Sequence, residues 1–67
     1  MMTDKQKSAV IAYARAGMSV NRAARDSFYH PNTIHGHLRA VTENTGLDPK
    51  NFFDLHRLYI MAKGEDG

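Results

Sequence analysis

The chain has no cysteine and no tryptophan, and only two of its 67 residues are proline. The absence of cysteine excludes disulfides and thiolate zinc sites and is typical of a protein from a reducing compartment. No run of apolar residues approaches the roughly 20 that a transmembrane helix needs, and no signal-peptide core is evident. We therefore expect a cytoplasmic protein that does not enter a membrane.

Positive and negative charges are unevenly distributed along the sequence. Residues 1–40 hold six Lys or Arg and two Asp, a net charge of +4, whereas residues 41–67 hold three basic and five acidic residues, a net charge of −2. A polyanionic partner is therefore expected to meet the first forty residues. An ordinary solvated surface is the alternative explanation.

Capping signals divide the chain into four helices. Thr3 and Gln6 form a capping box, Ser19 precedes a second helix, and Pro31 suits the first turn of a third. Asp48-Pro49 repeats the combination of cap and proline ahead of the fourth. No segment alternates with the period of a strand, and residues 64–67 are expected to fray. We predict an all-α fold, one small four-helix domain over residues 1–67, with helices at about 4–16, 20–27, 31–45 and 49–63.

The two middle helices follow the pattern of a helix-turn-helix. A short helix, a three-residue connection and a longer helix that begins with proline form the arrangement whose second helix lies in the DNA major groove. Ala24 is small enough for the two helices to cross closely, and Ile34 is suited to fix the second helix against the first. Many such turns contain glycine for a positive φ angle, whereas this one has Phe28 and Tyr29.

The region from Ser19 to Pro49 carries a recognisable set of residues: Ala24, Arg25, Phe28, Tyr29, His30, Asn32, Thr33, Ile34, Leu38, Val41, Thr45, Gly46, Leu47 and Asp48. With this set the chain resembles the C-terminal DNA-binding domain of PucR-type and sugar-diacid-type bacterial transcription regulators, and it is more distantly similar to the nucleoid protein Fis. The resemblance implies a sequence-specific DNA-binding transcriptional regulator. The chain departs from the family pattern at His35-Gly36-His37, where related sequences are rich in Arg and Tyr.

The third helix is expected to carry the DNA contacts on its outer face. At 100° per residue, Ile34, Leu38 and Val41 fall within about 60° of one another and point to the core. On the other side, Asn and Arg side chains pair with adenine and guanine, and Thr and Ala contact thymine methyl groups. The alternatives are a capping role for Asn32 and Thr33 and a solvated charge for Arg39. The candidate DNA-binding residues are Asn32, Thr33, His35, Gly36, Arg39 and Ala40, together with Arg22, Arg25 and His30.

The helix at about 49–63 has more apolar surface than one buried stripe requires. Phe52, Leu55, Tyr59 and Ala62 form such a stripe. Residues outside it are candidates for a homodimer interface that would set two recognition helices one DNA turn apart: Phe53, Leu58, Ile60 and Met61. The alternatives are that both sides of this helix pack in the core, or that the domain is a protein-interaction module that has lost DNA binding.

The residues indicate neither an enzyme nor a metalloprotein. The sequence has no Gly-rich phosphate loop and no HExxH motif, and we expect so small a core to offer no cleft. His35 and His37 lie about 200° apart on a helix and His30 precedes it, which argues against a zinc site. We expect no cofactor and no small-molecule ligand, and the expected partners are double-stranded DNA and a second copy of the chain.

Overall fold

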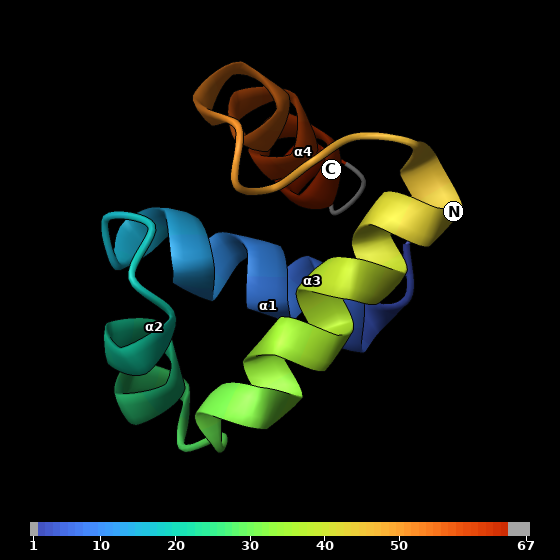
Figure 1. Cartoon of the computed structure of the whole chain (residues 1–67). Coiled ribbons are helices and arrows are strands. Elements are labelled where there is room, and N and C mark those ends of the chain that lie inside the picture. The colour runs from blue at the N-terminus through green and yellow to red at the C-terminus, as the bar shows by residue number, and fades with distance from the viewer. Residues whose placement is uncertain (1, 65–67) are drawn as a thin grey trace.

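The computed structural model describes residues 2–64, which form four α-helices (Figure 1). They are α1 (Asp4–Arg15), α2 (Val20–Ser27), α3 (Pro31–Thr45) and α4 (Phe52–Gly64). The predicted all-α fold is confirmed over this part of the chain. Gly64 is the last residue of α4, and the rest of the segment expected to fray lies outside the described residues. None of the described helices is long and apolar enough to cross a membrane.

Helix α1 is the centre of the fold, because it contacts each of the other three helices. Helices α2 and α3 also pack against each other, whereas α4 packs against α1. In Figure 1 the turn between α2 and α3 lies at the bottom of the molecule and α4 lies at the top, with α1 between them. The sides of α3 and α4 that point away from α1 are therefore not covered by another described helix.

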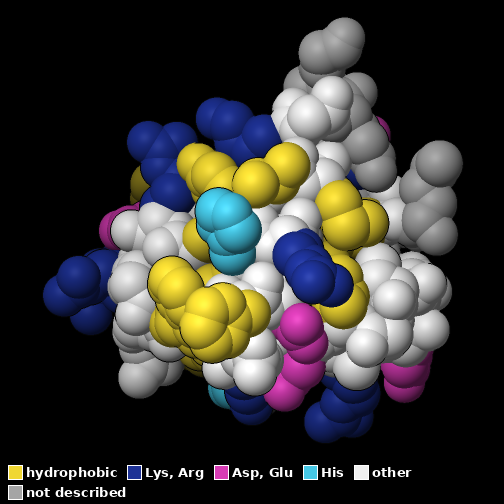
Figure 2. All heavy atoms as spheres, turned by 90° about the horizontal axis from the view of Figure 1, so that it is seen from above, with side chains coloured by type: hydrophobic (Ala, Val, Ile, Leu, Met, Phe, Trp, Pro, Cys, Tyr) yellow, Lys and Arg dark blue, Asp and Glu magenta, His cyan; other side chains and the backbone are white. Residues whose placement is uncertain are grey.

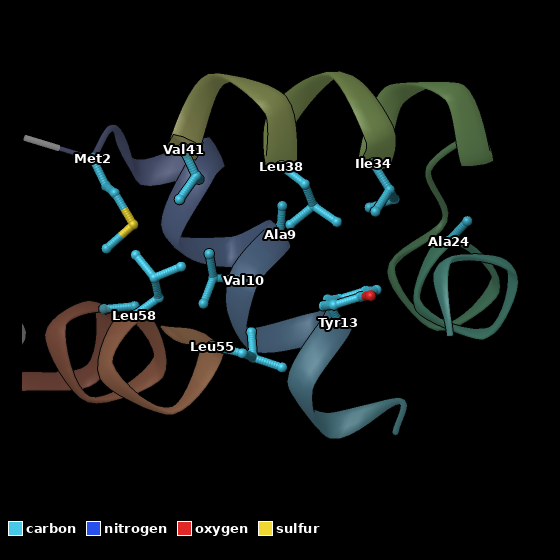
Figure 3. Close-up of a cluster of buried hydrophobic side chains, with 11 residues drawn as sticks. Met2, Ala9, Val10, Tyr13, Ala24, Ile34, Leu38, Val41, Leu55 and Leu58 are labelled. Atoms are coloured by element: carbon cyan, nitrogen blue, oxygen red, sulfur yellow. The ribbon is translucent and has the colours of Figure 1, made fainter. Parts of the chain in front are cut away.

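The core lies along α1, where side chains from all four helices meet (Figure 3). The predicted stripe of α3 is confirmed, since Ile34, Leu38 and Val41 are all buried. On α1, Ala9, Val10 and Tyr13 are buried, whereas Ile11 and Ala14 are half-buried. Burial on α1 spreads round the helix since it packs against neighbours on several sides. The buried hydrophobic cluster consists of Met2, Ala9, Val10, Tyr13, Ala24, Ile34, Leu38, Val41, Leu55, Leu58 and Ala62.

Helix α4 begins three residues later than predicted, because residues 48–51 form a turn of their own. The Lys50 N–H donates to Asp48 Oδ1 at 2.9 Å, and the Asn51 N–H donates to the Asp48 carbonyl at 3.0 Å. Asn51 Oδ1 then accepts the amide protons of Phe53 and Asp54 at 3.0 and 3.1 Å. Asn51 therefore caps α4 in place of Asp48.

The buried face of α4 also differs from the prediction. Leu55, Leu58 and Ala62 face the core, whereas Phe52, which was expected there, is 64% exposed. Leu58, a predicted dimer contact, is 0% exposed and lies beside Met2 and Val10 in Figure 3. The assignment of Leu58 to a dimer interface is therefore wrong. Because α4 is apolar most of the way round, its periodicity did not determine which side is buried.

Candidate nucleic-acid interface

The connection between α2 and α3 is fixed by its own backbone. Phe28 adopts the left-handed conformation, with φ 62° and ψ 25°, and its N–H donates to the Ala24 carbonyl. The Tyr29 N–H donates to the same oxygen at 3.0 Å. The Tyr29 ring lies edge-on to His37 of α3, with 6.0 Å between ring centroids. Phe28 thus supplies the positive φ angle that glycine supplies in many helix-turn-helix units, at a conformational cost.

His30 is the N-cap of α3. Its Nδ1 atom accepts the Asn32 N–H at 3.1 Å, and its carbonyl oxygen accepts the N–H groups of Thr33 and Ile34 at 2.9 and 3.2 Å. Pro31 occupies the first turn. Because His30 provides the cap, the alternative capping role for the side chains of Asn32 and Thr33 is not observed, and both residues are exposed.

The outer face of α3 is uncovered by the rest of the described chain. Asn32, His35 and Arg39 are exposed, and a Cβ atom added at Gly36 would meet nothing within 4 Å. Thr33 is exposed as well, and only Ala40 among the predicted contacts on this helix is half-buried. The structure therefore brings these candidates together on one accessible helix face, opposite the buried stripe of α3.

Two open hollows are among those on the described surface. One, of about 310 Å³, adjoins the outer face of α3 and reaches the turn before α4. It is lined by His35, Leu38, Arg39, Thr42, Glu43, Asp48, Pro49 and Lys50. The other, of about 390 Å³, lies between the end of α1 and α4 and is mainly apolar. Among residues 2–64 no group of three or more His, Cys, Asp or Glu could hold a metal ion.

The predicted basic contacts on α2 also share a face. Arg22 and Arg25 are three residues apart, hence about 60° apart around the helix, and both are exposed. Ala23 and Ala24, between them in sequence, are buried. Helix α2 therefore presents two guanidinium groups on the side that points away from the core.

The exposed apolar residues of α4 form a separate surface at the opposite end from the turn between α2 and α3 (Figure 1). Phe53, Ile60 and Met61, three of the four predicted dimer residues, are exposed. The ring of Phe53 packs edge-on against Phe52, with 5.4 Å between centroids. Figure 2, which looks onto this end of the molecule, shows hydrophobic side chains gathered around histidine and basic groups.

Comparisons with known proteins confirm the resemblance seen in the sequence. Residues 8–63 match the family model described as the PucR C-terminal helix-turn-helix domain. Similar curated proteins include uncharacterised proteins of Mycobacterium bovis and of two strains of Mycobacterium tuberculosis. Each is 37% identical over 51 residues, which cover 76% of this chain but only 12% of the relative. No solved structure matches significantly. The chain therefore belongs to the family of PucR C-terminal helix-turn-helix domains, a family of DNA-binding regulators.

Proposed function

We propose that this domain binds double-stranded DNA sequence-specifically as a transcriptional regulator, with α3 as the recognition helix in the major groove. The observation that carries the proposal is the uncovered outer face of α3, opposite a stripe that fixes the helix to the core. The major groove is about 12 Å wide and admits a helix whose outer side is free of the rest of the protein. We further propose a cytoplasmic location, where such a protein would meet chromosomal DNA.

Two side chains on α3 are suited to read base edges. Asn32 and Arg39 are seven residues apart, so they lie almost on one line along the helix and about 10.5 Å apart. That distance is close to the rise of three base pairs at about 3.4 Å each. Asn pairs bidentately with adenine and Arg with guanine, while Thr33 and Ala40 on the flank suit thymine methyl groups. Gly36 lies between Asn32 and Arg39 and lets the helix backbone approach the bases.

Other residues are suited to hold the phosphate backbone. Arg22 and Arg25 would set the register of the domain on DNA without reading sequence. His30 accepts a hydrogen bond at Nδ1, so a neutral ring carries its proton on Nε2 and can donate it to a phosphate oxygen. The N-terminus of α3, beside His30, is itself favourable for an anion.

We also propose that DNA is bound by a homodimer formed through Phe53, Ile60 and Met61 of α4. One helix-turn-helix reads only a few base pairs, and a two-fold pair would place two recognition helices roughly 34–36 Å apart. Sedimentation equilibrium at high micromolar concentration tests this arrangement. A monomer under those conditions would contradict the dimer but not the use of α3.

The site is tested by selecting a binding sequence from a random duplex pool and measuring affinities of variants for it. Asn32→Ala and Arg39→Ala should each lose about 1–3 kcal/mol of binding free energy and relax specificity at one base-pair position. Arg25→Ala should weaken all sequences alike and lower the salt slope by about one unit. Arg57→Ala, which removes an exposed positive charge from α4, is the matched control. If Asn32→Ala and Arg39→Ala lose no more affinity than Arg57→Ala, α3 is not the recognition helix.

A protein-interaction module is the second candidate, favoured by the exposed apolar side chains of α4. Surface patches of this kind mark sites of protein association. The two functions are separated by a mobility-shift assay with random duplex DNA at low salt, where even a non-specific DNA-binding protein shifts the duplex. The absence of a shift would favour the protein-interaction module.

A further inference from the structure

Phe28 is unfavourable to the free domain in two ways. Its left-handed conformation is one that bulky L-residues rarely adopt and that glycine adopts readily. Its side chain is also 94% exposed, the largest exposed fraction among the exposed large hydrophobic residues of the described chain. Met18, the other non-glycine residue of the described chain with a positive φ angle, packs against the core, whereas the Phe28 ring is not covered by the domain. The combination of an unfavourable backbone conformation and an uncovered ring at Phe28 points to a role outside the fold.

The side chains of the two residues after Phe28 make contacts within the domain, whereas the Phe28 side chain does not. The Tyr29 ring lies against His37, and the His30 ring holds the first turn of α3 through the Asn32 amide. The backbone of Phe28 is fixed by the hydrogen bond from its N–H to the Ala24 carbonyl. The turn therefore holds the Phe28 backbone in place while its ring projects into solvent beside the N-terminus of α3.

From this geometry we infer that Phe28 is a specificity-determining residue that contacts the C5-methyl group of a thymine in the major groove. The inference rests on the proposed function, because it extends the face of α3 that would enter the groove. Phe28 precedes Pro31, the first residue of α3, by three positions, so it lies at the end of α3 whose exposed face begins with Asn32 and Thr33. Apolar side chains, Phe among them, recognise thymine through this methyl group.

Duplex DNA fits this surface better than an apolar protein partner does. The surroundings of Phe28 are polar, with exposed Arg25 and Asp26 on the last turn of α2 and exposed His30 and Asn32 on the other side of the turn. Most of the exposed large hydrophobic residues, which would support a hydrophobic protein contact, are instead on α4, at the other end of the molecule (Figure 1). Tyr29, the other exposed aromatic residue of this turn, lies against His37, so the Phe28 ring is the more accessible of the two. An aromatic ring among hydrogen-bonding groups matches a groove where methyl groups lie beside polar base edges.

The experiment uses the selected duplex and replaces its thymines one at a time with deoxyuridine, which lacks only the C5-methyl group. For the wild-type chain, one replacement should lower affinity about fourfold, the amount expected for one lost apolar carbon. In Phe28→Asn the same replacement should have no effect, because Asn tolerates the left-handed conformation but offers no apolar contact. Phe52→Asn, which removes an exposed phenylalanine at the far end, should keep the wild-type dependence on thymine.

A second variant separates binding from folding. Phe28→Gly keeps the left-handed backbone conformation but removes its energetic cost. The melting temperature of this variant should therefore rise by several degrees, while its affinity for the selected site falls. The inference is overturned if every deoxyuridine replacement affects wild type and Phe28→Asn alike. It is also overturned if Phe28→Asn binds the unmodified site as tightly as wild type, as expected for a ring that contacts a protein. A wild-type chain that shifts no DNA at low salt would overturn the proposed function and this inference together.

Discussion

Replacing Gly36 with alanine tests the recognition helix through two effects of opposite sign. Glycine inside a helix is less favourable than alanine by about 1 kcal/mol. The backbone of Gly36 is helical, and an added Cβ atom would meet nothing within 4 Å. Gly36→Ala should therefore raise the free energy of unfolding by about 1 kcal/mol, which corresponds to about 4–8 °C in the melting temperature of a domain of this size. Far-UV circular dichroism during heating measures the shift.

The effect of Gly36→Ala on DNA binding should be a loss. If α3 enters the groove with its backbone close to base edges at Gly36, the added methyl group must push the helix outward, and affinity should fall on the order of tenfold, or 1.4 kcal/mol. Gly64→Ala, the same change on α4, is the matched control and should leave affinity unchanged. A more stable Gly36→Ala domain that binds its site as tightly as wild type would refute the close approach. An unchanged melting temperature would refute the energetic reasoning instead.

Three further predictions concern the core, the cap of α3 and alkaline stability. Leu58→Ala should cost about 2–5 kcal/mol in chemical denaturation, because Leu58 is fully buried within one chain; a negligible loss would contradict its place in the core. His30→Ala should cost about 1 kcal/mol through loss of the N-cap, and His30→Asn, which restores a capping side chain, should recover it; equal melting temperatures for the two variants would contradict the cap. Burial, and to a smaller extent the charge of Asp48, raises the pKa of Tyr13 above 10.0, so the stability that Tyr13 contributes is complete below pH 10.0 and is lost as the pH rises through the raised pKa. Thermal melts of Tyr13→Phe should therefore show a shallower alkaline decline than those of wild type, and identical slopes would count against the raised pKa.

The parts of the fold that depend on near neighbours in sequence could be predicted. The capping box of α1 is present, with the Gln6 N–H bound to Thr3 Oγ1 at 3.2 Å and the Thr3 N–H bound to Gln6 Oε1 at 3.1 Å. Ser19 caps α2 by accepting the Arg22 N–H at 3.2 Å. Gly46 adopts the left-handed conformation that ends α3. Each of these signals joins groups at most four residues apart, so no tertiary information is needed to find it.

The start and orientation of α4 could not be predicted, because both depend on tertiary contacts. Asp48 and Asn51 are equally good capping residues by type. In the structure Pro49 is buried in the turn and the Asp48 N–H donates to the Asp54 carboxylate at 3.0 Å, which leaves Asn51 as the cap. The helix starts later than expected and has apolar residues on most sides. As a result Phe52, which was expected in the core, is exposed, and Leu58, which was expected at a dimer interface, is buried.

The candidate site was predictable to a similar extent and for similar reasons. Helix α3 has one apolar and one polar side, so the exposed face could be derived from its periodicity alone. The role proposed for Phe28 could not be derived in this way. A positive φ angle at a bulky residue has no composition signal, because the sequence shows only that glycine is missing from the turn. The missing glycine was the available clue, and it indicated an unusual turn without identifying the residue that adopts it.

The arrangement of favourable and unfavourable residues supports a binding surface where α2 meets α3. Ser19 and Gly46 are residues suited to their caps, and Met18, which also has a positive φ angle, packs against the core. Stability alone would favour glycine at position 28 and alanine at position 36, whereas the sequence has phenylalanine and glycine there. A domain of this size has only about 3–10 kcal/mol of stability, so two such choices are a substantial loss. Phe28 precedes α3 and Gly36 lies in its exposed N-terminal half, as expected if they act in contact with a partner rather than within the fold.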